Sequence, residues 1–400
     1  MTISGPRAAQ VRLDRSFWKA ATLAVLVTAC CSLPVFLVGG LAVQIRGELD
    51  LPISRIGLLT AVFFTSSAAF STYAGRIAER IGASRSMRIS GAIGAMALVG
   101  LALAPAYAAL LSFLVLAGVA SALAQVGANL HLATRVDRSR QAFAFGIKQS
   151  GIPAATLLGG LAVPLIALTI GWRWAFAIGA VLSIIVVLSV PRAQSRRRTK
   201  HDTRVRPNNV RALVVLSIAG GFGSGAANSM GAYLVDSSVD AGLGEANAGL
   251  LFAVGSAAGL SMRVGAGWLA DRRTGGRLLW VAGLYLVGSA GFMLQATRDT
   301  DLLWLATLLC FAGGWGWPGL FNFAVVHRNP EAPAAATGLT QTGVYLGGVS
   351  GPLLFGVVAQ SFGYQAAWWG AAAFGLIACT AVLLARRMLL SAGEPEVEPG

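Results

Sequence analysis

The chain has 400 residues, of which 56% are hydrophobic and only 12% are charged, and its formal net charge is +15. Soluble proteins carry about 25% charged residues, so this composition excludes an ordinary soluble domain and favours the lipid bilayer as the solvent. The Lys and Arg residues gather in short loops between apolar stretches, so we expect no nucleic-acid partner.

Twelve apolar stretches are each long enough to cross about 30 Å of hydrocarbon as a helix. Their unbroken apolar runs exclude a barrel, whose strands would alternate. The sequence therefore predicts an all-α integral membrane protein with twelve transmembrane helices. The ranges are 20–43, 55–74, 87–105, 108–130, 143–168, 174–190, 211–235, 248–269, 277–296, 302–326, 336–358 and 365–385.

The chain begins with a polar, basic segment, Met1–Ser16, and the following apolar run is long enough to span, so we expect no cleaved signal. When the stretches are threaded with residue 1 inside, the outer loops keep only Arg46, Arg55, Arg173 and Arg298 of all the basic residues. By the positive-inside rule both termini are cytoplasmic. We expect a plasma-membrane location, the inner membrane of a bacterium.

A basic, polar segment at 191–211 divides the chain. We expect an N-terminal bundle over 1–190, a cytoplasmic linker over 191–211, a C-terminal bundle over 212–390 and a disordered tail over 391–400. The other loops are too short for a catalytic domain, so we expect no enzyme. The four cysteines lack metal-ligand spacing and no nucleotide motif is present, so we expect no metal and no cofactor.

The chain repeats itself at an offset of 192 residues. Gly75 matches Gly267, Arg80 matches Arg272, and Gln149 matches Gln341. A membrane protein made of two similar halves usually binds its cargo between them. The repeat predicts two pseudo-symmetric six-helix bundles.

The loops after the second and eighth stretches share a pattern of glycine, acid and base. The first copy contains Gly75, Glu79, Arg80, Gly82 and Arg85, and the second contains Gly267, Asp271, Arg272 and Arg277. The acids and bases of such a loop can pair with each other and with neighbouring helix ends. In the second copy Thr274 stands where the first has Gly82, and Gly275 follows one residue later.

This pattern, with the twelve stretches and the half-length repeat, resembles the major facilitator superfamily of secondary transporters over essentially the whole chain. The resemblance implies two six-helix bundles that alternate access to a central site. It also implies that the two loops act as a latch between the halves. A simpler alternative is that their charges only mark the cytoplasmic side.

Polar residues inside the predicted spans are the candidate substrate contacts, because such groups are costly in lipid. In the family, the helices that carry them line the cavity or the interface between halves. We select Gln125, Asn129, Lys148, Gln149, Asn228, Trp315, Asn322, Gln341 and Tyr345. Packing is the competing explanation for the tryptophan.

Lys148 is the strongest of these candidates, because a lysine within a span could neutralise an anionic cargo. The alternative is that its side chain extends to the nearby cytoplasmic surface. No Asp or Glu lies near the middle of any span. Many exporters of cationic drugs use a buried carboxylate, so its absence disfavours them.

We therefore predict a secondary-active or facilitative transporter of a small organic anion or polar metabolite, working by alternating access, alone or with a co-transported proton. The alternative is drug or metabolite efflux by proton antiport. A non-transporting sensor or scaffold is disfavoured by the short loops. We expect a monomer in the bilayer.

Overall fold

The computed structural model describes residues 15–137, 140–192, 209–272, 276–329 and 331–391, and every regular element among them is a helix. Helices satisfy all their backbone hydrogen bonds internally, as a lipid environment requires. The predicted all-α class is confirmed.

Helical segments follow one another along the described chain. Those before residue 200 are α1 (Arg15–Gly40), α2 (Ala42–Leu49), α3 (Ser54–Ile81), α4 (Ala83–Ala102), α5 (Tyr107–Arg135), α6 (Gln141–Lys148), α7 (Gly151–Ala162), the π-helix η2 (Val163–Ala167), α8 (Leu168–Ile170) and α9 (Trp172–Ser189). Those after it are α10 (Val210–Asp240), α11 (Glu245–Arg272), α12 (Arg277–Thr297), α13 (Leu302–Leu309), the π-helix η3 (Cys310–Gly314), α14 (Pro318–Arg328) and α15 (Pro333–Ser391).

Ten helical segments of the described chain are long and apolar enough to cross a membrane. One of them, α15, contains a kink at Gly363 and so consists of two helices. α4 has 20 residues, which is also enough to span. Dividing α15 and adding α4 gives twelve segments, and each overlaps one predicted stretch. The short helix α2 was not predicted.

Two glycines that lie 192 residues apart have the same unusual backbone. Gly171 has a φ of 101° and Gly363 a φ of 84°. A side chain would strain this conformation, and glycine adopts it freely. Each glycine turns the chain between two helices, so the repeat seen in the sequence extends to the backbone.

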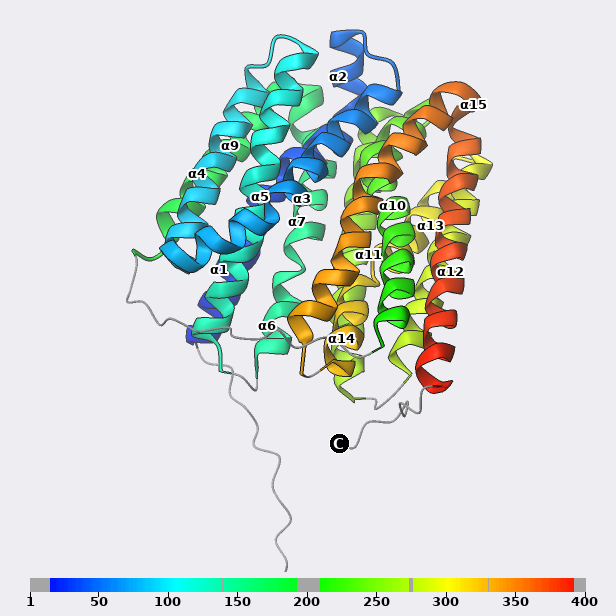
Figure 1. Ribbon diagram of the computed structural model, residues 1–400. Helices are drawn as coiled ribbons and strands as arrows, with labels where there is room; N and C mark the ends of the chain where they lie inside the picture. The colour runs from blue at the N-terminus through cyan, green and yellow to red at the C-terminus, as the bar shows by residue number, and fades with distance from the viewer. Residues whose placement is uncertain (1–14, 138–139, 193–208, 273–275, 330, 392–400) are drawn as a thin grey trace, which may run out of the picture.

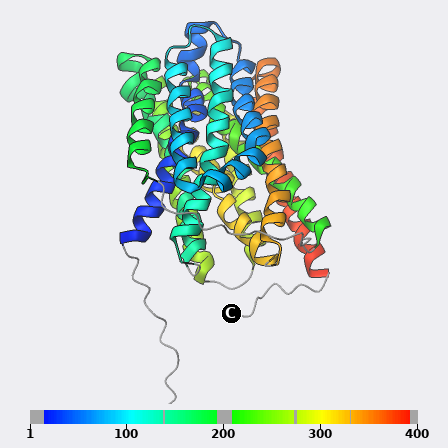
Figure 2. The same ribbon diagram turned by 60° about the vertical axis from the view of Figure 1, so that its left-hand side comes forward.

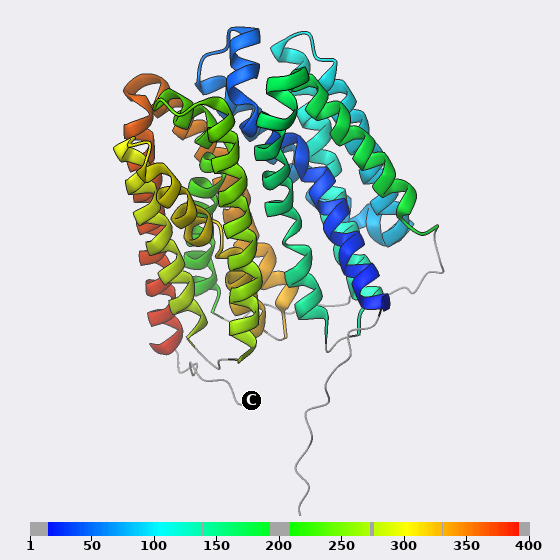
Figure 3. The same ribbon diagram turned by 180° about the vertical axis from the view of Figure 1, so that it is seen from behind.

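The helices form two groups, which lie side by side in Figure 1 and, from behind, in Figure 3. In the first group, α1–α9, α5 packs against α1, α3 and α4. In the second group, α10–α15, α15 packs against α10, α12 and α14. Three helix pairs provide the main contacts between the groups: α1 with α10, α3 with α15, and α7 with α11. This is the expected pair of bundles.

The two ends of the molecule differ. We call the end that carries α2 and the turn at Gly363 the upper end, as drawn in Figure 1. The opposite, lower end carries the start of α1 and the end of α15, which Figure 2 also shows. The first predicted span therefore begins, and the last one ends, at the same end of the molecule.

Glycines allow the two groups to touch backbone to backbone. A Cβ placed on Gly160 of α7 would lie 2.6 Å from the nitrogen of Ala253 and 2.7 Å from the oxygen of Gly249, both on α11. A Cβ on Gly249 would in turn lie 2.8 Å from the oxygen of Gly160. Small residues at such crossings are how membrane helices approach closely.

We expect Gly160→Ala to destabilise the protein by about 1–3 kcal/mol, because the added methyl forces the two backbones apart. Gly283→Ala is the matched control, since a Cβ added to that helical glycine of α12 would meet nothing within 4 Å. The control should unfold at an equal or higher temperature, because alanine favours the helix. Thermal unfolding in detergent measures both. Equal midpoints for the two variants would contradict the close contact.

Candidate functional site

Lys148 lies at the end of α6 and is 2% exposed. Its Nζ donates a hydrogen bond to Oε1 of Gln125 on α5. In the described part of the chain, its ammonium group has no salt-bridge partner. An ammonium has three donors, so one acceptor leaves most of its bonding capacity unused. The buried position does not favour the alternative in which the side chain reaches the surface.

Asn129 does not join this pair. It follows Gln125 by one turn of α5, as the sequence indicated, but its side chain is exposed while Gln125 is half-buried. Among the described residues the side chain of Asn129 has no hydrogen-bond partner.

A break in the fifth predicted span leaves a backbone carbonyl without its helical hydrogen-bond donor. Gln149 and Ser150 separate α6 from α7. In a continuous helix the Gln149 carbonyl would accept from the nitrogen of residue 153, but that residue is Pro153 and has no N–H. Arg263 of α11 supplies the donor instead, with Nη1 2.9 Å from the Gln149 oxygen.

The same guanidinium also binds a carbonyl at a second helix break, in the other group. Nε and Nη2 of Arg263 donate to the carbonyl oxygen of Trp315, at 3.0 and 2.9 Å. Trp315 lies between the π-helix η3 and α14. Arg263 thus connects interrupted helices of the two groups. Like Lys148, it forms no salt bridge among the described residues.

The sequence prediction did not select Arg263. It lies six residues inside the predicted range 248–269. The rule that selected Lys148, a basic residue within a span, would also have selected Arg263.

In the second group, Gln341 of α15 donates to Oδ1 of Asn322 on α14 at 3.0 Å. This bond joins two of the predicted residues. It connects the two helices whose counterparts in the first group, α5 and α6, are joined by Gln125 and Lys148. Gln341 therefore bonds within its own group. The side chain of Gln149 makes no hydrogen bond in the described structure.

The remaining candidates lie on separate elements. Asn228 of α10 donates to the carbonyl and the hydroxyl of Ser224 on its own helix, at 2.9 and 3.0 Å. The buried ring of Trp315 packs edge-on against Phe36 of α1, with centroids 5.5 Å apart. Tyr345 is half-buried on α15. The tryptophan ring therefore contributes to packing between the groups, and its role as a substrate contact stays a prediction.

The upper end is closed by polar contacts between the groups. Arg46 of α2 forms a salt bridge with Asp236 of α10. Gln44 donates to Glu245 of α11 at 2.6 Å. Towards the same end, the hydroxyl of Tyr233 on α10 donates to the carbonyl of Ile53 at 3.1 Å.

The first latch sequence lies at the lower end, between α3 and α4. Gly82 has a φ of 85° and forms the turn, whereas a Cβ on Gly75 would meet nothing within 4 Å. Glu79, Arg80 and Arg85 are exposed. They form no salt bridge within the described structure.

The second latch sequence is only partly described. The backbone of Gly267, Asp271 and Arg272 belongs to α11, but their side chains lie outside the described residues. The guanidinium of Arg277 lies 4.6 Å from the ring centroid of Phe323 on α14.

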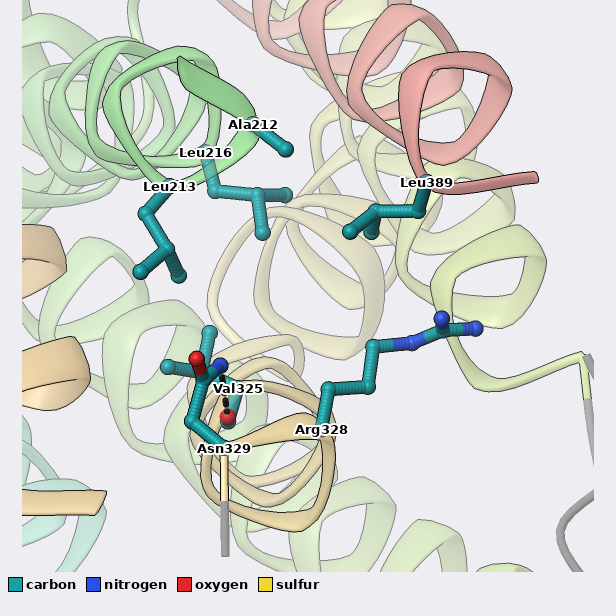
Figure 4. A pocket seen from close by; sticks show the side chains of 7 residues that line it. All are labelled: Ala212, Leu213, Leu216, Val325, Arg328, Asn329 and Leu389. Carbon is teal, nitrogen blue, oxygen red and sulfur yellow. Dashed lines mark hydrogen bonds between the residues drawn. The ribbon is translucent and has the colours of Figure 1, made fainter. Parts of the chain in front are cut away.

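A small pocket lies inside the second group, apart from the candidate residues (Figure 4). Asn329 donates to the carbonyl of Val325 at 3.0 Å, and its Oδ1 is buried without a partner in the described structure. The other lining is largely aliphatic. The pocket does not lie between the groups, so we do not include it in the candidate site. It is lined by Ala212, Leu213, Leu216, Val325, Arg328, Asn329 and Leu389.

Comparison with known proteins gives consistent matches. The family model of the Major Facilitator Superfamily matches residues 24–349. The multi-drug resistance efflux pump PmrA of Streptococcus pneumoniae is 28% identical over 84% of this chain and 88% of its own length. Polyol transporter 5 of Arabidopsis thaliana is 28% identical over 42% of this chain and 32% of its own length.

Among solved structures, a bacterial homologue of the human lysosomal transporter Spinster, in an inward-facing and occupied conformation, superposes with a TM-score of 0.74. It is 16% identical, and the match covers 95% of this chain and 98% of that one. At this identity the match shows the fold.

We expect Arg263→Met to lower the unfolding temperature, because each orphaned carbonyl costs about 1–3 kcal/mol when buried. In a Pro153→Ala background the loss should be smaller, since residue 153 regains an N–H that the Gln149 carbonyl can accept. A double-mutant cycle of thermal unfolding midpoints measures this coupling. Additive effects of the two substitutions would contradict the role assigned to Arg263.

Proposed function

The chain belongs to the Major Facilitator Superfamily, and we propose that it transports a small organic anion or polar metabolite across the membrane by alternating access. It is a multi-pass membrane protein of a small-molecule transporter family. The anionic cargo and the residues that bind it are the parts we add.

Lys148 carries this proposal. Removing an ammonium ion from water costs several kcal/mol unless a partner compensates. Gln125 offers Lys148 only a neutral carbonyl oxygen, and no carboxylate of the described chain neutralises the charge. An anionic cargo would supply the missing negative charge. Buried ionisable groups in membrane proteins mark substrate pathways for this reason.

Arg263 adds a second positive charge from the opposite group. Its three hydrogen bonds are all to backbone carbonyls, which leave the guanidinium charge without a counter-ion among the described residues. The Gln149 carbonyl that it binds is adjacent in the chain to Lys148. An anion attracted to this region would therefore meet cationic residues of both groups. Gln149, Asn129, Asn228, Asn322, Gln341 and Tyr345 are the polar contacts we propose beside them.

We propose the domain boundaries given by the sequence: bundles over 1–190 and 212–390, a linker over 191–211 and a tail over 391–400. Three polar contacts connect the groups near the upper end. Below them, Arg263 makes the described hydrogen bond between the groups. This distribution supports a state that is closed above and opens towards the lower end.

The two loops at the lower end would then form the latch of the opposite state. We assign this role to Gly75, Glu79, Arg80, Gly82 and Arg85, and to Gly267, Asp271, Arg272 and Arg277. Glu79 and Arg80 are exposed, without a salt bridge in the described chain. That is the arrangement expected when the latch is released.

We infer a monomeric transporter rather than an enzyme, with both termini in the cytoplasm of a bacterium, so that the lower end faces inwards. An anion that enters a cell moves against about 2.3 kcal/mol per 100 mV of negative interior potential. A co-transported proton would compensate for this cost.

A second candidate is drug or metabolite efflux by proton antiport, which the similarity to PmrA favours. The cations Lys148 and Arg263 disfavour positively charged drugs. Efflux predicts that deletion raises sensitivity to apolar cations, whereas uptake predicts lost growth on a nutrient.

We expect Lys148→Gln to weaken binding of the anion at least about tenfold, the effect of losing about 1.5 kcal/mol from a charge-assisted contact. Counterflow of a panel of radiolabelled organic anions in proteoliposomes measures this. Lys19→Gln is the matched control, because Lys19 is exposed on α1. Unchanged anion exchange by Lys148→Gln, or no exchange of any anion by the wild type, would overturn the proposal.

A further inference from the structure

Asp236 is the one buried carboxylate of the described residues, at 5% exposure. It lies one turn before the end of α10, at the upper end of the second group. The other buried charged side chain in the described structure is Lys148. A buried carboxylate needs compensation, and the groups that compensate Asp236 come from two other elements.

The first of these groups crosses to the other half of the molecule. Arg46 of α2 donates through Nη1 to Oδ2 of Asp236, with side-chain exposures of 26% and 6%. The second is the hydroxyl of Tyr364 on α15, which donates to the same oxygen. Asp236 therefore accepts two hydrogen bonds and holds α2 of the first group against the second.

A tight turn positions Arg46 for this contact. The backbone nitrogen of Leu51 donates to the carbonyl of Arg46 at 3.1 Å, and Nε of Arg46 donates to the carbonyl of Leu51 at 3.2 Å. Asp50 adopts a left-handed φ of 49° to close the turn. With Nε engaged in this way, Nη1 is directed towards Asp236.

Few other titratable groups face Asp236. On its own helix, Tyr233 lies one turn earlier and bonds to the Ile53 carbonyl. From α5, Tyr107 lies near Tyr233, and Arg55 of α3 stacks on Tyr107 with 5.0 Å between its Cζ and the ring centroid. The α1 segment from Cys31 to Gly40 contains no Asp, Glu, His, Lys or Arg.

Another acid, Glu245 of α11, closes the same end. It accepts from Gln44 at 2.6 Å. This donor is neutral, so protonating Glu245 leaves no unpaired charge. Protonating Asp236, by contrast, leaves the partly buried Arg46 cation without its counter-ion.

We propose that Asp236 is a proton-binding site, at which a proton taken from the upper side releases Arg46 and opens that side of the protein. The inference rests on the alternating access of the proposed function and adds the ion that operates the upper gate. In the closed state the carboxylate must stay charged, because it is the counter-ion of Arg46. In the open state the contact with Arg46 is already broken, so a proton on the carboxylate costs no salt bridge. Acid therefore favours opening.

Two other carboxylates at the upper end cannot act in this way. Asp240 pairs with Arg298, and Glu48 pairs with Arg173. Each pair lies within one group and is exposed to solvent, with Asp240 at 53%. Hydrogen bonds from Arg173 and Trp172 also hold the pKa of Glu48 below its usual range. Protonation of these groups breaks no contact between the halves.

Double electron–electron resonance, which measures the distance between two spin labels, tests the proposal without any substrate. Labels are attached at Leu103 and Phe362, which are 74% and 77% exposed and lie at the upper end of different groups. The 400-residue chain carries serine in place of its four cysteines and a new cysteine at each labelled position, and it is placed in lipid nanodiscs. The ratio of the open to the closed population, read from the two label distances, should rise as the pH falls from about 6 to about 3, because an aspartate in water titrates near pH 4. The limit for one linked proton is about tenfold per pH unit.

Asp236→Asn and Arg46→Gln should each raise the open population at neutral pH and remove its pH dependence. Asp240→Asn and Glu245→Gln should keep the wild-type response. The proposal is overturned if the wild type does not respond to pH, if Asp236→Asn still responds, or if Glu245→Gln abolishes the response. Because no cargo is present, these outcomes are independent of whether anions are transported.

Discussion

The absence of water inside a membrane is the constraint on which the rest of the structure depends. Each backbone carbonyl that loses its helical donor must find another within the protein. Pro153 creates such a carbonyl at Gln149, and the donor that answers it is Arg263, from the opposite group. One proline in one half thereby explains why a positive charge of the other half lies between them.

Much of the fold was predictable because apolar length and glycine spacing are local properties of the sequence. The turns at Gly171 and Gly363 follow from residues that any reader of the repeat can align. The candidate site was harder to predict from the sequence. Gln125 and Lys148 were selected for their polarity, and the hydrogen bond that joins them was not apparent from the sequence. The pairing of Arg46 with Asp236 could not be read from the chain, because 190 residues separate them and the repeat does not relate them.

The two halves share a scaffold and differ in charge. Lys148 of the first group stands opposite Thr340 in the repeat, and the corresponding bond of the second group is the neutral pair of Asn322 and Gln341. The two groups therefore have similar backbones but carry different charges at corresponding positions. Arg263 connects the groups below the closed end, and Lys148 precedes the residue whose carbonyl it binds, whereas the buried anion, Asp236, lies within that end. A negatively charged cargo and a proton would accordingly be recognised at different depths.

The contacts of α11 form a lever. Glu245 at its upper end and Arg263 lower down both bind the first group, and 18 residues of helix place them about 27 Å apart. A tilt of about 10° around the Arg263 contact would carry Glu245 through about 5 Å, well beyond the reach of any hydrogen bond. A rotation of about 10° around this contact is therefore enough to separate α11 from the first group at the far end.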